Sequence, residues 1–332
     1  MIGADTENYY LFFKKMVSLD EVNSYTLSHT RFQPGYSIFV SFVKSIFGYF
    51  FVLQLIVALF LNYTLYSFII KHTKYLFTTF LVYFLINYLE FNTEIQRESI
   101  AISFGLLSYM LYERKKYIIA AIFVLIALEF HISAIVIVLY PILDRIKFSY
   151  SSYFIILVFI CGIIPATYVS IPDLYGLVSM VLNLNNWNVE QFVGQELNDK
   201  WNMNFYIVHA AKNVVLPFFM ILYIEKRQKT NLVGFVYMWC TLQFLNMYSY
   251  GFYRFANYFA PFVWLYYSLF IVTFIKQHFY KIRIIIMFIF SALILYFYQD
   301  HLLRHDGGFI SEDSYKYERY FPYKSIFTEG VY

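Results

Sequence analysis

The chain has 332 residues, of which 60% are hydrophobic and only 14% are charged. A soluble domain has about 45–50% apolar and about 25% charged residues, so this composition excludes a soluble enzyme, a disordered protein and a secreted disulfide scaffold. The formal charge of +4 is spread along the chain without a basic block, so we expect no nucleic-acid partner. The composition predicts an all-α, polytopic membrane helical bundle.

Apolar runs follow one another from residue 49 onward. About 20 mostly apolar residues are needed for a helix that crosses the ~30 Å hydrocarbon core of a bilayer. Membrane segments are expected at residues 49–70, 75–90, 98–112, 117–143, 149–170, 206–224, 232–249, 252–275 and 282–299. The domain organisation predicted from these runs is an outer N-terminal segment at 1–47, one membrane domain at 48–299 with an outer loop at 171–205, and an outer tail at 300–332.

Lys and Arg residues near the ends of the segments predict the orientation. Thirteen of the 25 basic residues lie in five short connectors, at residues 71–74, 113–116, 144–147, 225–229 and 276–283. Short basic connectors stay in the cytoplasm, which places the longer polar segments on the outer face. An outer N-terminal segment of this length is expected to follow a signal or an upstream membrane helix, so we expect such a helix ahead of Met1.

The apolar run at residues 117–143 lies between two basic connectors that both belong inside. It is too short for two full crossings and long for one. We expect a re-entrant pair of half-helices with its bend near residues 129–133, buried in protein or lining a wet cavity. A single tilted helix is the alternative. With this pair, the bundle has about nine or ten membrane segments.

Three ionisable residues, Arg97, His131 and Arg254, lie in or beside apolar sequence at the expected outer face. An ionisable side chain at bilayer depth costs about 2.5–3.5 kcal/mol on insertion scales, so it is a functional candidate by default. Two guanidinium groups and an imidazole suit an anionic substrate, because guanidinium binds phosphate through two parallel hydrogen bonds. The plainer alternatives are that the arginines anchor to lipid headgroups and that the histidine is a packing residue.

Several short motifs, in order, resemble the EpsG-type, Wzy-like polysaccharide polymerases of bacteria. The stretch from Glu94 through Arg97 and Ala101 to Phe130-His131-Ile132-Ser133-Ala134 is similar to the family's arginine helix start, basic turn and Phe-His-x-Ser-Ala step. The family's Gly-x-Asp segment, Glu-Pro-Gly step, Arg-(x)3-Tyr-Phe pattern and terminal Pro-Tyr step are matched, in chain order, by Gly3 to Tyr9, Gln33 to Tyr36, Arg254 to Phe259 and Pro322 to Phe327. Gln33 replaces the family's acidic residue.

This resemblance implies a glycosyltransferase of the GT-C type. Such an enzyme joins oligosaccharide units carried on undecaprenyl diphosphate, which serves as both donor and acceptor, at the periplasmic face of the inner membrane. It implies metal-independent transfer with neither metal nor cofactor, and an O-antigen or related product of lipopolysaccharide synthesis. Membrane lipid, a chain-length regulator and a flippase are the implied partners.

Roles for individual residues follow from the same resemblance. The expected catalytic residues are His131 as base, with Asp5 and Glu94 as alternatives. The residues expected to bind the diphosphate are Arg97, Arg254 and Arg31. The residues expected to contact sugar are Tyr9, Gln96, Tyr258 and Tyr323. The loop at 171–205 is expected to cover the site.

Other classes of membrane protein stay open. A ligase of finished glycan is the near neighbour of a polymerase. A transporter or flippase of lipid-linked oligosaccharide should show internal repeats and polar residues at mid-membrane in both halves, and the sequence shows neither. A membrane O-acyltransferase also uses a histidine within the membrane, but its acyl donor would arrive from the cytoplasmic side.

Overall fold

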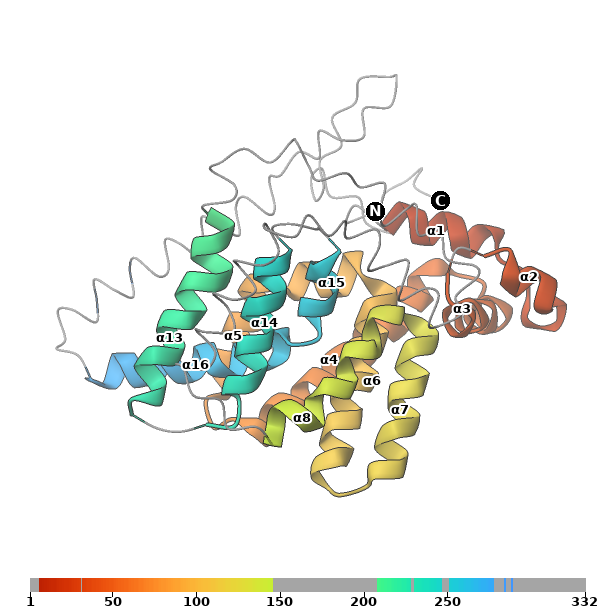
Figure 1. Ribbon diagram of the computed structural model, residues 1–332. Helices are drawn as coiled ribbons and strands as arrows, with labels where there is room; N and C mark the ends of the chain where they lie inside the picture. The colour runs from red at the N-terminus through yellow and green to blue at the C-terminus, as the bar shows by residue number, and fades with distance from the viewer. Residues whose placement is uncertain are drawn as a thin grey trace, which may run out of the picture. The chain divides into compact units, whose positions relative to one another are not determined.

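The computed structural model describes residues 6–145 except Arg31, residues 208–277 except 228–229 and 247–250, and the single residues Ile284 and Phe288. Within these ranges every regular element is a helix, which confirms the all-α class (Figure 1). The chain divides into two units, Met1–Ala134 with Ile271–Tyr332, and Ile135–Phe270. The predicted loop at 171–205, the tail at 300–332, the segment at 149–170 and nearly all of 282–299 lie outside the described residues.

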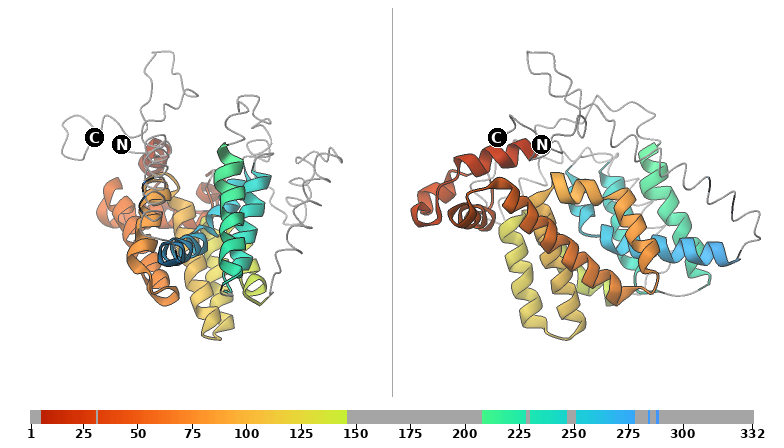
Figure 2. Two further views of the ribbon diagram at one scale, coloured as in Figure 1. Left: turned by 90° about the vertical axis from the view of Figure 1, so that its left-hand side faces the viewer. Right: turned by 180° about the vertical axis from the view of Figure 1, so that it is seen from behind.

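The first unit holds the helices of the N-terminal part of the chain. They are α1 (Thr6–Lys15), α2 (Ser24–Ser28), α3 (Pro34–Phe47), α4 (Phe50–His72), α5 (Leu76–Ile86), α6 (Gln96–Glu113) and α7 (Tyr117–Phe130). In this unit α6 packs against both α4 and α7 (Figures 1 and 2). Helices therefore occupy all four of the membrane segments predicted between residues 49 and 130.

The two faces of α4 show what surrounds it. One face buries Leu53, Val57 and Leu61 against the rest of the unit. The opposite face exposes the large apolar side chains of Phe51, Leu55, Leu59, Tyr63, Tyr66 and Ile70. A helix that is apolar on all sides needs an apolar solvent on its outer face, so this exposed face is suited to lipid.

By length and composition, two helices of the described part can cross a bilayer, Phe50–His72 and Val208–Glu225. Three more apolar helices are shorter, at Leu76–Ile86, Tyr117–Phe130 and Val233–Leu245. These helices support a membrane protein. The predicted number of nine or ten segments stays a prediction.

The run at residues 117–143 is broken inside the predicted bend. Helix α7 ends at Phe130, and His131 takes an extended conformation with φ −156° and ψ 124°. A 3₁₀ helix at Ile132–Leu139 and the short α8 (Tyr140–Arg145) follow. The alternative of one uninterrupted helix is therefore wrong, while re-entry into the membrane stays a prediction.

The second unit contains α8, α13 (Leu216–Glu225), α14 (Val233–Leu245), α15 (Phe252–Asn257) and most of α16 (Ala260–Gln277). The segment predicted at 252–275 is not one continuous helix, because α15 and α16 are separate helices. Pro261 explains the break, since proline has no N–H to donate to the carbonyl four residues earlier. At the break, the Tyr140 hydroxyl donates to the Tyr258 carbonyl over 2.6 Å.

An ion cluster joins the ends of α4 and α6 in the first unit. Glu113 accepts from Lys71 Nζ at 2.5 Å and from His72 Nε2 at 2.9 Å. Burial by itself raises the pKa of Glu113, but the hydrogen bonds and charges of His72 and Lys71 outweigh burial, so its pKa lies below the ordinary value. The carboxylate is therefore held ionised in the folded protein.

We expect the protein to lose stability when Glu113 is protonated. A depressed folded-state pKa adds stability above the unfolded-state pKa, and that stability disappears as the pH falls through the folded-state pKa. Glu113→Gln should lower the melting temperature at pH 7 by an amount equivalent to about 1 kcal/mol or less, because the cluster is partly exposed. It should also flatten the fall of melting temperature between about pH 5 and pH 3. Melting curves of the two proteins in detergent that coincide at every pH would contradict this role.

Candidate functional site in the first unit

The first turn of α6 follows a π-helical turn at Glu90–Glu94. Side chains bind two carbonyl groups of this wide turn: Ser99 Oγ donates to the Phe91 carbonyl at 2.5 Å, and Thr6 Oγ1 donates to the Thr93 carbonyl at 2.8 Å. π-Helical turns occur often at functional sites. The first N–H groups of a helix have no acceptor within it and carry its partial positive charge, so the start of α6 is suited to an anion.

A closed triangle of polar side chains fixes this turn against α4 and α5. The Tyr83 hydroxyl donates to Asn62 Oδ1 at 3.1 Å and accepts from Asn92 Nδ2 at 2.8 Å, while Asn62 Nδ2 donates to Asn92 Oδ1 at 2.6 Å. Polar contacts between helices in lipid each contribute about 0.6–2 kcal/mol. The triangle therefore positions the turn that leads into Arg97.

Removing the hydroxyl at the corner of this triangle should loosen it. Tyr83→Phe loses two hydrogen bonds while keeping the ring, so we expect destabilisation of about 1–2 kcal/mol, visible as a lower melting temperature. Tyr63→Phe is the matched control, because Tyr63 lies on the exposed face of α4. Equal losses in the two variants would show that the triangle does not stabilise the turn.

Arg97 is held by two uncharged neighbours. Its guanidinium carbon lies 4.0 Å from the centre of the Phe32 ring, and its Nη1 donates to Gln33 Oε1 at 2.9 Å. Its Nε is buried and has no hydrogen-bond partner among the described residues. Neither the ring nor the amide carries a charge that would neutralise the guanidinium.

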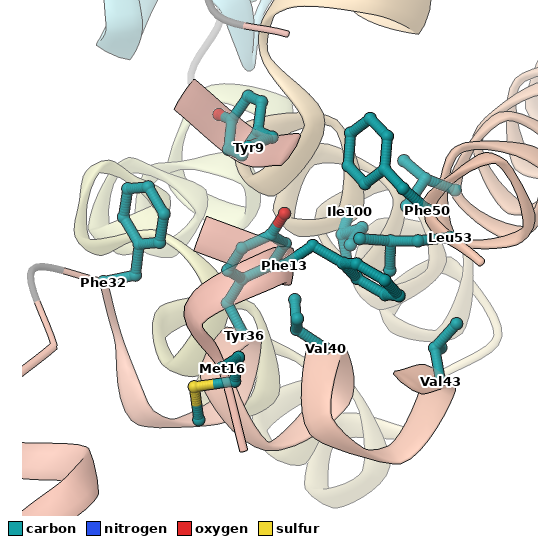
Figure 3. Packing of buried hydrophobic residues seen from close by; sticks show 11 residues of the cluster. Tyr9, Phe13, Met16, Phe32, Tyr36, Val40, Val43, Phe50, Leu53 and Ile100 are labelled. Carbon is teal, nitrogen blue, oxygen red and sulfur yellow. The ribbon is translucent and has the colours of Figure 1, made fainter. Parts of the chain in front are cut away.

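Aromatic side chains pack around Phe32, the ring that Arg97 contacts. Phe32 lies 5.8 Å from Tyr9 and 5.6 Å from Tyr36 between ring centres, and the three rings gather at one side of the core cluster in Figure 3. The pKa of Tyr36 is raised, first by burial and then by Tyr9, while the nearby Arg97 charge acts in the opposite direction. The Tyr36 hydroxyl has no hydrogen-bond partner in the described part of the chain. Tyr9, one of the residues predicted to contact sugar, packs against the rings of Phe32 and Tyr36 and is buried.

The side-chain amide of Gln96 makes no hydrogen bond to any described residue. The side chain is nevertheless fully buried. A buried polar group without a partner costs about 1–3 kcal/mol, and native proteins seldom keep one without a functional reason. Glu94, two residues earlier, is also buried. Buried amide and carboxyl groups beside Arg97 are typical of a site that a polar ligand completes.

The end of α7 reaches the same region through α3. A Cβ atom at Gly35 would lie 2.6 Å from Glu129 Cβ and 2.8 Å from the Glu129 carbonyl oxygen, so the two backbones touch. His131 follows two residues later; it is buried, with Nδ1 hydrogen-bonded to Ser133 Oγ. The beginning of α3 therefore contacts Arg97 through Gln33 and the end of α7 through Gly35.

The structure thus brings five predicted residues into one unit: Tyr9, Glu94, Gln96, Arg97 and His131. It adds Phe32, Gln33 and Tyr36, whose part in the site the sequence did not reveal. The motif at residues 33–36 was a signal for Gln33 and Tyr36, but it does not include Phe32 and gave no sign that Gln33 binds Arg97. Asp5, Arg31 and Tyr323 lie outside the described residues.

Two predicted residues belong to the second unit. Arg254 lies on α15, where its Nε donates to the Tyr253 hydroxyl at 3.2 Å. The Tyr258 side chain is fully buried, and its carbonyl accepts the Tyr140 hydrogen bond. Within the described ranges, no three His, Cys, Asp or Glu side chains are grouped so that they could hold a metal ion.

Comparison with known proteins agrees with the resemblance that the motifs gave. Neither the curated proteins nor the solved structures contain a match. The model of the EpsG family matches residues 1–325, nearly the whole chain. Together with the apolar helices, this match identifies a helical membrane protein, and the chain belongs to the EpsG family.

Proposed function

We propose that the protein is a polysaccharide polymerase that joins oligosaccharide repeat units carried on undecaprenyl diphosphate at the periplasmic face of the bacterial inner membrane. Membership of the EpsG family supports a polymerase of this general kind. The observation that carries the proposal is Arg97, which lies at the start of α6, contacts the uncharged Phe32 and Gln33, and stands beside buried polar groups that have no hydrogen-bond partner among the described residues. A GT-C type architecture and an O-antigen product are parts of the same proposal.

The reaction places its largest change of charge on the leaving group. The acceptor hydroxyl oxygen bonds to the anomeric carbon of the donor sugar, and the bond from that carbon to the diphosphate oxygen breaks. The electron pair leaves with undecaprenyl diphosphate, which gains negative charge in the transition state. A fixed guanidinium and the positive end of α6 stabilise that charge without reorganising. Arg254 and Arg31 are proposed as further ligands of the diphosphate.

The acceptor hydroxyl must lose its proton, and His131 is the proposed base. An imidazole titrates near neutral pH and accepts a proton readily. If Nδ1 carries the hydrogen of the bond to Ser133, Nε2 is the basic nitrogen. Asp5 and Glu94 are the alternative bases, of which Glu94 lies three residues before Arg97.

Contacts with sugar are proposed for Gln96 and Tyr323, and a supporting role around the sugar is proposed for Tyr9 and Tyr258. Gln96 has the most direct support, because its amide offers both a donor and an acceptor that no described residue uses. Tyr9 and Tyr258 are buried, so we propose that they support the site rather than stack on a sugar. The transfer is proposed to need no metal, and a chain-length regulator and a flippase are the proposed protein partners.

The phenotype of a His131→Ala strain separates polymerisation from translocation. Loss of the base should stop chain extension but not export, so the surface glycan should consist of single repeat units. Gel profiling of surface glycan measures this directly, with His29→Ala as control, because His29 is exposed on the surface of the same unit. Loss of all surface glycan would instead indicate a flippase, which is the alternative function.

A further inference from the structure

Helix α3 has an apolar face that no described part of the chain covers. The buried face carries Tyr36, Ser37, Val40, Ser41 and Val43. The opposite face exposes Ile38, Phe42, Ile46 and Phe47, each by 42–55%. The spacing of four residues places Ile38, Phe42 and Ile46 in one row along the helix. A helix bathed in water on that side would carry polar side chains there.

The single charged residue of α3 is also compatible with an apolar environment for the exposed row. Lys44 is its one charged residue, and the Lys44 ammonium group is occupied by the Lys14 carbonyl at 2.9 Å and by the Met16 carbonyl. The lysine thus caps the end of α1 instead of solvating the exposed row. No charge on α3 therefore opposes contact between that row and an apolar phase.

Along the chain, the exposed row of α3 is followed directly by the exposed face of α4. Gly48, with φ +73°, ends α3, and Tyr49, which is 65% exposed, is the only other residue before α4 begins at Phe50. Phe51 and Leu55 then start the exposed apolar face of α4. Tyrosine is enriched at the boundary between lipid and water, which is where the corner between the two helices would lie.

The length and direction of α3 decide how it meets the membrane. Its 14 residues span about 21 Å, less than the ~30 Å hydrocarbon core. In Figure 1 α3 is seen nearly along its axis, whereas α4 runs across the view, so the two axes are strongly inclined. If α4 crosses the bilayer, α3 cannot run beside it through the core.

We propose that α3 lies in the lipid–water interface on the outer side of the membrane that holds the protein. The side chains of Ile38, Phe42, Ile46 and Phe47 are then inserted among the lipid chains just below the headgroups. Helices that lie in the membrane interface bury their apolar face by about 5–10 Å. Gln33 and the Arg97 bonded to it then lie at headgroup depth. The proposal does not depend on catalysis, but it explains how the site described above meets the phosphates of a lipid-borne substrate.

Lipid quenching of a fluorescent label tests the proposal in the full-length protein. A Phe42→Cys variant in liposomes is labelled with bimane, and wild type treated in the same way gives the background from Cys161 and Cys240. Fluorescence should fall most with lipid brominated near the headgroup. A Leu59→Cys label on the exposed face of α4 should fall more with lipid brominated deep in the chain, and an Asp20→Cys label should respond to iodide in water. Ile46→Cys on the same row of α3 serves if Phe42→Cys does not fold.

Three outcomes would overturn the proposal. Quenching of the Phe42→Cys label by iodide alone would place α3 in water. Protection from both iodide and bromolipid would show that protein covers the row, either a second copy or another segment of this chain. Strongest quenching by deeply brominated lipid would place α3 within the hydrocarbon core. None of these results depends on polymerase activity, so they are distinguishable from a failure of the proposed function.

Discussion

Replacing Arg97 by alanine is expected to abolish long-chain polymer while the protein still accumulates in the membrane. The guanidinium is the charged group aimed at the leaving diphosphate in the proposed reaction, and loss of one such group costs about 100- to 1,000-fold in rate. Its partial exposure means that the variant should fold. Glycan chain-length profiling of a complemented deletion strain, together with membrane abundance of the protein, measures both parts of the prediction.

Three further variants make this result specific. Arg97→Lys keeps the charge but cannot both stack flat on Phe32 and donate from a planar group to Gln33, so we expect it to recover only part of the activity. Arg114→Ala is the matched control, because Arg114 is exposed at the other end of α6, and it should leave chain length unchanged. Arg254→Ala is expected to behave like Arg97→Ala. Normal chain length in either Arg97→Ala or Arg254→Ala would reduce that arginine to a membrane anchor.

Gly35→Ala is expected to cause a large loss of stability for the addition of a single methyl group. The new Cβ would lie 2.6 Å from Glu129 Cβ and 2.8 Å from the Glu129 carbonyl oxygen. Neither atom is the flexible end of a side chain, so α3 and the end of α7 must move apart. Overpacking of this kind costs about 1–3 kcal/mol. It should lower the melting temperature, and it should also lower polymer yield, because His131 follows the displaced residue.

The matched control is Gly48, the glycine that ends α3. Gly48 has φ +73°, and a Cβ atom there would meet nothing within 4 Å. Asparagine tolerates this left-handed conformation better than other residues, so Gly48→Asn should change stability by only a few tenths of a kcal/mol. If the Gly35→Ala protein has the same melting temperature as the wild type, the contact between α3 and α7 is not tight.

Those parts of the fold that depend on local sequence were predictable. The apolar stretches placed α4, α5, α6 and α7, because a helix in lipid must satisfy its backbone internally and show apolar side chains outward. The bend near His131 was predicted because two basic connectors flank an apolar run that is too short for two crossings of the membrane and long for one. The break between α15 and α16 was missed, although Pro261 was a local signal for it.

Contacts between distant residues were beyond the sequence. Gln33 and Arg97 are 64 residues apart, and Asn62 and Asn92 are 30 apart. Neither spacing has a periodicity that reveals the partner, since both contacts depend on how α3, α4 and the π-helical turn pack. The family motifs named Arg97 and Gln96 as functional residues, but only the packing shows that Arg97 contacts Phe32 and Gln33 and that the Gln96 amide has no partner within the part of the chain that the structure describes.

The most direct test of the central claim is polymerisation by the purified protein in lipid. Supplied with undecaprenyl-diphosphate oligosaccharide and a metal chelator, it should form chains that are multiples of the repeat unit and release undecaprenyl diphosphate, both seen by mass spectrometry. The Arg97→Ala protein should form neither, while Arg114→Ala should form both. An unchanged oligosaccharide, activity restored only by added Mg²⁺, or equal products from the Arg97→Ala protein would contradict a metal-free polymerase that holds its leaving group at Arg97.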